Sequence, residues 1–510
     1  MSFTRDQVVL FLQAPGWMGN LIALLAGLAL TLSFAPVGWF PLAFLSIALL
    51  WILVDALHCQ QAAVRAYFFG VGFFGSGVSW IYISIHEFGE SPWWAASILT
   101  FLLISFLSGY LAILFYLLRR WCNNTSPWRR WLLWYPAAWA LMEWVRGWLF
   151  TGFPWLNLGY SQTESWLVGF APVFGVIGVS FFVALTGGIL ACLMLLQQRI
   201  LFLCALLLVI CGGAFVLDQH QWTKTDGKKI TVALVQGNVA QEIKWESDSL
   251  AATLKLYQSL TEKHWDADLI VWPETAIADF MDEVYDSFVA PLAQTAQAKQ
   301  SRILSGIPVY NPKTEEYTNS ATILGEGEIQ LYHKRHLVPF GEYVPLDHLF
   351  RGFIENFLKI PMSGFTKGDP DQKLMQFFGH PVGTNICYEI AFGEELIEDL
   401  PDAELLVTLS NNAWFGDSFA PFQILQMAQF QAREVERDLL LSTNDGVTAV
   451  VNARGKVQSQ LPQFKVAVLR DEVVLRQGAT PYVRWGNYPI VIFLSFLLFG
   501  LFFYQSRSGS

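Results

Sequence analysis

Long apolar runs fill the first 217 residues and recur once near the end of the chain. A helix needs roughly 20 apolar residues to cross the hydrocarbon core of a bilayer. The runs, of which the first two are short, lie at 21–34, 41–54, 67–85, 94–118, 131–150, 174–196, 200–217 and 488–504. They predict a polytopic α-helical membrane domain with eight transmembrane helices. No small-residue cleavage pattern follows the first run cleanly, so we expect it to be retained.

The region between the seventh and eighth runs has a different pattern. Short β-type runs lie at 230–236, 269–272, 303–307, 321–324, 382–386, 405–409, 440–443 and 447–451. Helix-like stretches between them lie at 248–264, 283–299 and 420–438. The alternation predicts an α/β domain with buried sheets. We therefore expect a transmembrane domain of seven helices at 1–217, an α/β domain at 218–487, and a last helix with a short tail at 488–510.

The distribution of charge agrees with this division. Residues 1–217 hold 14 of the 74 charged side chains and no lysine, although 15% of the 510 residues are charged and 54% are hydrophobic. An ordinary soluble protein is about one quarter charged, so a single soluble globule is excluded. The net charge of −10, with no basic tract, argues against binding of nucleic acid.

Arginines mark one side of the predicted membrane domain. If the N-terminus is cytoplasmic, eight arginines fall in the inside loops and tails, while the opposite loops at 35–40, 86–93 and 151–173 hold no Arg or Lys. The eight are Arg5, Arg65, Arg119, Arg120, Arg129, Arg130, Arg199 and Arg507. Cytoplasmic loops are enriched in such residues. We therefore expect a multi-pass protein of a bacterial inner (cytoplasmic) membrane, with both termini cytoplasmic and 218–487 in the periplasm.

Three segments of the α/β region each carry one reactive group after or near a β-type run: Glu274, Lys334 and Cys387. Cys387 is the only cysteine of that region, so it has no disulfide partner there. A thiol of pKa about 8.5 is a poor nucleophile at pH 7 until a base takes its proton. Glu274 could be that base, and Lys334 could hold the oxyanion formed when the thiolate attacks a carbonyl.

The segments Trp272-Pro273-Glu274, L-V-P-F-G-E-Y after Lys334, and Cys387-Tyr388-Glu389 resemble the Glu-Lys-Cys triad segments of the nitrilase (carbon–nitrogen hydrolase) superfamily. Together with the membrane block, the whole chain resembles the apolipoprotein N-acyltransferase family. The resemblance implies a nitrilase-like α-β-β-α sandwich in which Glu274 is the general base, Lys334 the oxyanion stabiliser and Cys387 the nucleophile. It assigns supporting or substrate-binding roles to Glu342, Tyr388, Glu389 and Trp245.

The family resemblance also implies a reaction. Cys387 would take an acyl chain from a membrane phospholipid as a thioester, then pass it to the α-amino group of S-diacylglyceryl-cysteine at the N-terminus of an apolipoprotein. This ping-pong transfer requires no metal and no organic cofactor, and nothing in the sequence demands more than a monomer in the lipid bilayer. His333 and His336 lack companion ligands at zinc-like spacing.

Several alternatives remain open on the residues alone. Cys387 can be an inert buried cysteine, Glu274 a surface carboxylate or helix cap, and Lys334 part of a solvated basic turn. Glu342 and Glu389 can be structural, and Trp245 can serve packing. For the whole protein, the alternatives are a membrane-anchored nitrilase-type amidase that transfers acyl groups to water, and a transporter or receptor with a degenerate outer domain. The complete triad and the few ionisable groups within the spans disfavour the last.

Three further features of the sequence each allow two interpretations. Glu143 and Arg146 lie three residues apart within a predicted span, where they can form a structural pair or contact a headgroup or substrate. The polar segment 411–416 can line the site or be a plain turn. Residues 345–366 combine aromatic residues at near-helical spacing with two glycines, which suggests a mobile interfacial lid or, alternatively, a packed loop.

Overall fold

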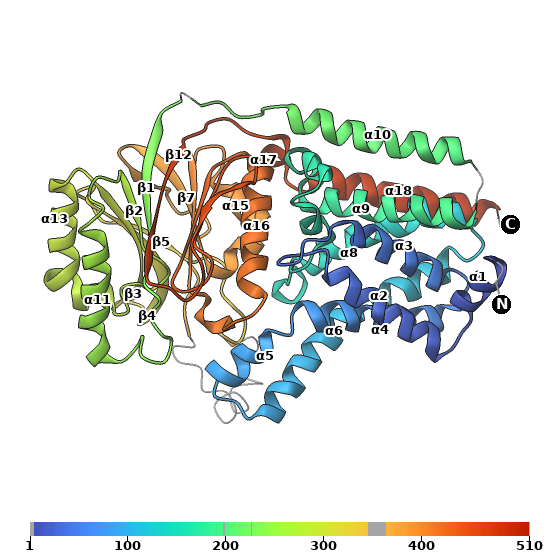
Figure 1. Cartoon of the computed structure of the whole chain (residues 1–510), viewed down its shortest axis with the longest axis horizontal. Helices are drawn as coiled ribbons and strands as arrows, with labels where there is room; N and C mark the ends of the chain where they lie inside the picture. The colour runs from blue at the N-terminus through green and yellow to red at the C-terminus, as the bar shows by residue number, and fades with distance from the viewer. Residues whose placement is uncertain (1–4, 197–198, 226, 345–363, 509–510) are drawn as a thin grey trace. The chain divides into compact units, whose positions relative to one another are not determined.

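The computed structural model describes residues 5–196, 199–225, 227–344 and 364–508 (Figure 1). The chain divides into two compact units. The first comprises Met1–Tyr82, Ala96–Gln221 and Arg484–Ser510, and the second comprises Ile83–Ala95 and Trp222–Val483. The short segment Ile83–Ala95 belongs to the second unit because it contacts a loop there: the Ser84 hydroxyl donates to the Trp414 carbonyl at 2.7 Å. Most of the lid proposed from the sequence, 345–363, lies outside the described residues.

The first unit is helical. Its main helices are α1 (Arg5–Gln13), α2 (Trp17–Thr31), α3 (Pro41–Asp55), α4 (Cys59–Gly77), α6 (Trp93–Trp121), α8 (Tyr135–Arg146), α9 (Ala171–Leu195), α10 (Ile200–Gln219) and α18 (Tyr488–Ser508). Helix α3 is almost wholly buried and packs against α9, while α2 packs against α4. A Cβ atom at Gly27 would overlap the Phe69 carbonyl of α4. Small residues therefore let the two backbones approach closely, as in many membrane bundles.

The structure does not confirm the eight transmembrane helices that the sequence predicts. Among the described residues, three helical segments are long and apolar enough to cross a membrane: Trp93–Trp121, Trp166–Leu195 and Ile200–Gln219. A bent pair, Cys59–Gly77 with Ile81–Phe88, would be a fourth. Helices α2 and α3 have 15 residues each, which at about 1.5 Å per residue is shorter than a bilayer core of about 30 Å. The fifth predicted run is broken into a π-helix, Arg130–Trp134, and the 12-residue α8.

The second unit contains two six-stranded sheets. The first has the order β12-β1-β2-β3-β4-β5, with bounds β12 (Ala467–Val474), β1 (Lys229–Gln236), β2 (Leu269–Val271), β3 (Arg302–Asn311), β4 (Glu316–Leu324) and β5 (Gln330–His333). The second has the order β11-β10-β9-β8-β7-β6, with bounds β11 (Val457–Gln460), β10 (Ala449–Val451), β9 (Leu439–Thr443), β8 (Leu405–Ser410), β7 (His380–Ile386) and β6 (Met375–Phe377). Three neighbouring strands run parallel at the centre of each sheet, β1-β2-β3 and β7-β8-β9.

The main core of this unit lies between the two sheets. Val232 and Val271 of the first sheet share one apolar cluster with Val407 and Leu440 of the second. A second cluster joins the outer face of the first sheet to α11 (Ser247–Thr261) and α13 (Ala290–Ala298), while α16 (Ala420–Val435) packs against the second sheet (Figure 1). Parallel strands buried on both faces are nearly continuous in apolar residues, as these are. The predicted α/β fold with two sheets is confirmed.

Candidate active site

The candidate catalytic residues follow the ends of three strands. Strand β2 leads through Trp272 and Pro273 to Glu274, β5 leads directly to Lys334, and β7 leads directly to Cys387. Cys387 has φ of 54°, a left-handed backbone that is uncommon for a residue with a side chain. It begins a short 3₁₀ helix, Cys387–Ala391, so the chain turns sharply at the thiol. Such strained positions are concentrated at functional sites.

Strand β3 brings the Glu274 turn close to the sheet through Gly306. The Gly306 N–H donates to the Pro273 carbonyl at 3.2 Å. A Cβ atom at Gly306 would lie 2.8 Å from the Cα atom of Glu274, closer than real Cβ contacts. A residue other than glycine here would therefore push the carboxylate out of position.

A lysine and an asparagine hold two carboxylates together. The Lys334 Nζ atom lies 2.8 Å from Glu342 Oε1 and 3.8 Å from Glu274 Oε1. The Asn319 side-chain amide donates to both carboxylates, at 2.8 Å to Glu274 and 2.9 Å to Glu342. Only 1% of the Lys334 side chain is exposed, so its charge depends on these partners. The two carboxylates raise the pKa of Lys334 against the opposing effect of burial, and the ammonium stays charged.

The other oxygen of the Glu274 carboxylate is held from the second sheet. Its Oε2 atom accepts a hydrogen bond from the backbone N–H of Asn411 at 2.8 Å. The Lys244 ammonium donates to the Glu274 backbone carbonyl at 3.1 Å. Both carboxylate oxygens and the main chain of Glu274 are therefore restrained, which pre-organises this group for proton transfer.

The Cys387 thiol is protonated in this environment. Burial raises its pKa to about 12, the negative charge of Glu274 adds to the rise, and the positive charge of Lys334 and a hydrogen bond with Ser410 oppose it. A thiol of that pKa is not a nucleophile at neutral pH unless a neighbouring base removes its proton as it attacks. Glu274 and Lys334 act on the thiol with opposite charge, which is the combination that general-base catalysis and oxyanion stabilisation require.

Glu389 supports the turn that carries the thiol. Its Oε2 atom accepts from the backbone N–H of Ile386 at 2.6 Å. Its Oε1 atom accepts from the Tyr332 hydroxyl and from the backbone N–H groups of Arg335 and His336, at 2.9, 2.6 and 3.0 Å. Burial raises the pKa of Glu389 to about 7, and the hydrogen bonds and Lys334 oppose the rise. This carboxylate ties β7 to the segment after β5.

The remaining residues named from the sequence lie beside this cluster. The Tyr388 ring packs against the rings of His336 and Phe392, with centroids 5.7 and 5.1 Å apart. Trp245 is partly buried and directly follows Lys244. The structure thus pairs Lys334 directly with Glu274 and Glu342, places Cys387 within their electrostatic reach, and holds Tyr388 and Glu389 in the turn that Cys387 begins.

Three polar residues of the site are not among the candidates named from the sequence: Lys244, Asn319 and Ser410. A fourth, Asn411, belongs to the segment 411–416, which the sequence offered as a possible lining of the site. Asn411 follows β8, and its side chain donates to Gln241 at 2.7 Å and accepts from Asn444 at 3.1 Å. The polar segment 411–416 was therefore a usable signal. Lys244 was adjacent to Trp245 in the segment already singled out. Asn319 lies among other polar residues of β4, and Ser410 is the last residue of β8. Sequence alone gives no sign of the partners of either side chain.

Glu143 and Arg146 have structural contacts in the first unit. The Glu143 carboxylate accepts from the Trp139 indole at 2.8 Å and from the Leu158 N–H at 2.9 Å. The Arg146 guanidinium donates to the carbonyl of Trp155 at 2.6 Å and to the side chain of Asn157 at 2.6 Å. Both side chains therefore hold the loop before α9 against α8.

No group of three or more His, Cys, Asp or Glu side chains within the described residues has a geometry that could hold a metal ion.

Two sheets packed face to face, with a glutamate, a lysine and a cysteine at their strand ends, define a carbon–nitrogen hydrolase domain. The family model described as carbon-nitrogen hydrolase matches residues 231–478, and the model described as apolipoprotein N-acyltransferase N-terminal domain matches residues 26–189. The chain belongs to the apolipoprotein N-acyltransferase family, as the sequence predicted.

Relatives of known name cover nearly the whole chain. The apolipoprotein N-acyltransferase of Methylococcus capsulatus is 41% identical over 92% of this chain and 93% of its own length. That of Pseudomonas putida is 40% identical over 95% of this chain and 96% of its own. Among solved structures, a CN-hydrolase superfamily protein from Xanthomonas campestris is similar over 48% of this chain and 91% of its own, with 18% identity and a TM-score of 0.37. A likeness of that size adds nothing to the family assignment.

Proposed function

We propose that this N-acyltransferase moves an acyl chain from a membrane phospholipid to the α-amino group of S-diacylglyceryl-cysteine at the N-terminus of an apolipoprotein. The observation that carries the proposal is the ion-paired cluster of Glu274, Lys334 and Glu342, whose charges act on the buried thiol of Cys387. Such a cluster suits acyl transfer through a covalent intermediate. The apolar helices of the same chain give it access to lipid substrates.

In the first half-reaction, Cys387 attacks the ester carbonyl of the phospholipid. Glu274 takes the thiol proton as the carbon–sulfur bond forms, and Lys334 stabilises the negative charge that develops on the carbonyl oxygen. The ester carbon–oxygen bond then breaks, and Glu274 returns the proton to the departing alkoxide of the lysophospholipid. The acyl chain remains on Cys387 as a thioester.

In the second half-reaction, the acceptor amine replaces the sulfur. An α-amino group has a pKa of about 8, so a fraction is neutral and nucleophilic at neutral pH. The amine attacks the thioester carbonyl, Lys334 again stabilises the oxyanion, and the carbon–sulfur bond breaks. Glu274 removes a proton from the nitrogen atom of the attacking amine and passes it to the Cys387 thiolate. The resting thiol is thereby restored.

The supporting residues act through this triad. Glu342 and Asn319 fix the Lys334 ammonium and one oxygen of Glu274 relative to each other. Glu389 fixes the strand-to-helix turn of Cys387. We assign Tyr388 and Trp245 to the walls of the site, where an acyl chain or acceptor would pass.

The proposed setting is a bacterial inner membrane crossed eight times, with domains at 1–217, 218–487 and 488–510. The catalytic domain would lie in the periplasm and both termini in the cytoplasm. Support comes from the eight arginines that this topology places inside and from the long apolar helices of the first unit. One chain supplies all residues of the cluster, so we propose that the protein acts as a monomer.

Mass spectrometry of the full-length protein after incubation with a phospholipid alone tests the proposal. We expect one acyl chain on Cys387, released by hydroxylamine at neutral pH as a thioester is. Cys387→Ala should abolish the adduct, and Cys204→Ala, which removes an exposed cysteine of the first unit, should leave it unchanged. An adduct that survives Cys387→Ala would overturn the mechanism. Release of free fatty acid in place of an amide, with acceptor present, would support the amidase alternative.

A further inference from the structure

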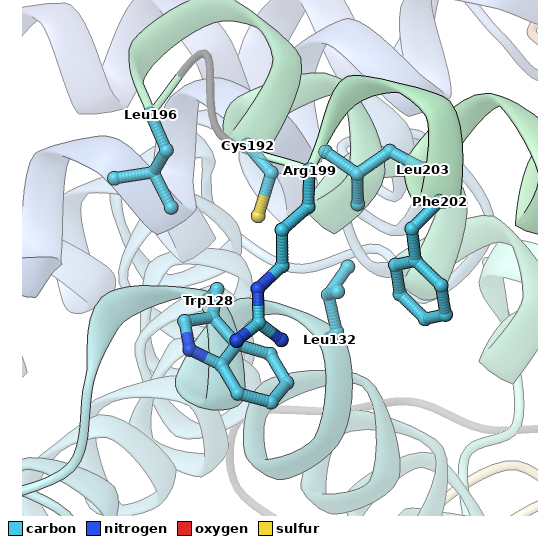
Figure 2. Close-up of a pocket in the computed structure, with 7 residues that line it drawn as sticks. All are labelled: Trp128, Leu132, Cys192, Leu196, Arg199, Phe202 and Leu203. Atoms are coloured by element: carbon cyan, nitrogen blue, oxygen red, sulfur yellow. The ribbon is translucent and has the colours of Figure 1, made fainter.

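A hollow in the helical unit lies at the ends of its longest apolar segments. Trp128, Leu132, Cys192, Leu196, Arg199, Phe202 and Leu203 line it (Figure 2). Helix α9 ends at Leu195 and α10 begins at Ile200, so the hollow lies where these two candidate spans meet. Helix ends of this kind lie at the level of lipid headgroups, where tryptophan and arginine are enriched.

Two arginines gather around one indole ring of this hollow. The guanidinium carbon of Arg199 lies 4.7 Å from the centroid of the Trp128 ring, and that of Arg129 lies 5.3 Å from the same centroid. At most about 10 Å therefore separates the two like charges, about one Debye length at physiological salt. In the part of the chain that the structure describes, neither guanidinium has a carboxylate partner. The nearby carboxylate of Asp55 is already paired with Arg130 at 2.6 Å.

The apolar side of the hollow continues along α10. Phe202 lines the hollow and is 54% exposed, and beyond it Leu208 and Val209 are 72% and 70% exposed. A surface of this kind is stable in contact with acyl chains and is costly in water. The site therefore has a cationic end at headgroup level and an apolar path that runs along a candidate span.

We propose that this hollow binds the headgroup phosphate of an anionic phospholipid, with one acyl chain lying along α10. The lipid would be a structural ligand of the leaflet that the proposed topology makes cytoplasmic, and is separate from the acyl donor at Cys387. Charge complementarity favours this occupant: two guanidiniums that contact aromatic rings but no carboxylate of the described residues attract an anion. Each basic residue near an anionic surface contributes about 1 kcal/mol. Arginine suits phosphate because its planar donors match the oxygens in pairs.

The test uses the full-length protein in phosphatidylcholine nanodiscs that contain a small fraction of photo-activatable phosphatidylglycerol. We expect cross-links to peptides that carry 128–134 or 199–203. Arg199→Gln should reduce them about fivefold, and Arg199→Gln with Arg129→Gln should reduce them tenfold or more. Arg120→Gln is the matched control, because it removes an exposed arginine at the end of α6 that does not line the hollow.

Three results would overturn the proposal. They are equal cross-linking by a photo-activatable phosphatidylcholine, an equal loss in Arg120→Gln, and displacement of the lipid by inorganic phosphate at millimolar concentration, which would indicate a free-phosphate site. Acylation of Cys387 in the same nanodiscs serves as an independent readout. It should persist in every arginine variant, so failure of the lipid site and failure of the proposed acyl transfer remain distinguishable.

Discussion

Both units bury charged side chains, but they use them differently. In the helical unit, Arg65 donates to the backbone carbonyls of Leu12, Ala14 and Leu53, and Asp55 receives two bonds from Arg130 at 2.6 Å. Arg65 is therefore held mainly by backbone carbonyls, and Asp55 by one opposite charge. In the α/β unit, two carboxylates converge on Lys334 beside a protonated thiol. Burial of charge alone therefore does not identify the site.

The proposed catalytic cluster differs from these structural pairs in how its charged groups are held. In a structural pair, each charged side chain satisfies the other. Removing one partner leaves a buried charge alone and lowers the stability of the fold. The site cluster keeps Glu274 and Lys334 3.8 Å apart, joined mainly through Glu342 and Asn319. That leaves both groups able to act on the thiol and its substrate. Substitutions in the site should reduce the reaction rate, and substitutions in the helical unit should reduce stability.

The largest effect is expected from Glu274→Gln. The amide cannot take the thiol proton, and the contribution of such a base is typically 10²–10⁴ in rate. We expect thioester formation on Cys387 to slow by that factor while the unfolding midpoint changes little, because an amide oxygen can still accept from Asn319 or Asn411. Single-turnover acylation followed by mass spectrometry measures the rate. A loss of folded protein in place of a loss of rate would break the distinction between the units.

In the helical unit, Asp55→Asn should produce the opposite result. It leaves the buried Arg130 guanidinium without its counter-charge, and breaking a buried pair in this way costs about 3–5 kcal/mol. We expect a lower thermal midpoint in detergent and an unchanged acylation rate per folded molecule. Glu472→Gln, which removes the exposed partner of Lys229, should leave both quantities unchanged. A slowed reaction in folded Asp55→Asn would show that this pair also serves the site.

Lys244 offers a test of pH dependence. Burial lowers its pKa from 10.5 to about 8, against the attraction of Glu274, Asp445 and Cys387. Between those two values the unfolded chain binds the proton more tightly than the folded one, so stability rises with pH through this window. Below pH 8 the Lys244 ammonium is charged in both the folded and the unfolded state. The full free-energy cost of burying this charge, about 3 kcal/mol, is then present.

We therefore expect Lys244→Met to gain stability relative to the wild type at pH 7 and to lose most of that gain by pH 10. Thermal unfolding from pH 7 to pH 10 measures the difference. Lys255→Met, an exposed position on α11, should show no such trend. A difference between Lys244→Met and wild type that stays constant with pH would contradict a depressed pKa at Lys244.

The central strands of the fold could be predicted from the sequence because they are apolar throughout. The run 405–409 is nearly the whole of β8, and 230–236 matches β1 apart from one residue. The predicted set lacks the four strands at the sheet edges, β5, β6, β11 and β12, because partly exposed strands carry polar residues between apolar ones. In the helical unit, the apolar run 131–150 indicated a span, although local bonds of Glu143 and Arg146 end α8 and hold an irregular loop there.

The site residues divide in the same way. Glu274, Lys334 and Cys387 are recognisable because each lies in a segment with a family pattern directly after a strand. Asn319 and Ser410 are not, because their partners are Glu274, Glu342 and Cys387, which are far away in the sequence and are brought close only by the fold. Glu342 lies between these cases: the sequence names it as a supporting residue, and only the structure gives its distance to Lys334.

The smallest effect is expected from Glu342→Gln. This change removes the charge 2.8 Å from Lys334 Nζ but keeps an oxygen that can accept from Lys334 and Asn319. Because Glu342 helps to raise the pKa of Lys334, its loss should lower that pKa while Glu274 still keeps the ammonium charged. Supporting residues of this kind typically contribute 10–100-fold, so we expect acylation to slow by about that factor. Glu326→Gln, which weakens the Arg302 pair away from the site, is the matched control. A loss as large as that of Glu274→Gln would mean that Glu342 itself transfers a proton, and the site would then have two catalytic carboxylates in place of one catalytic and one positioning group.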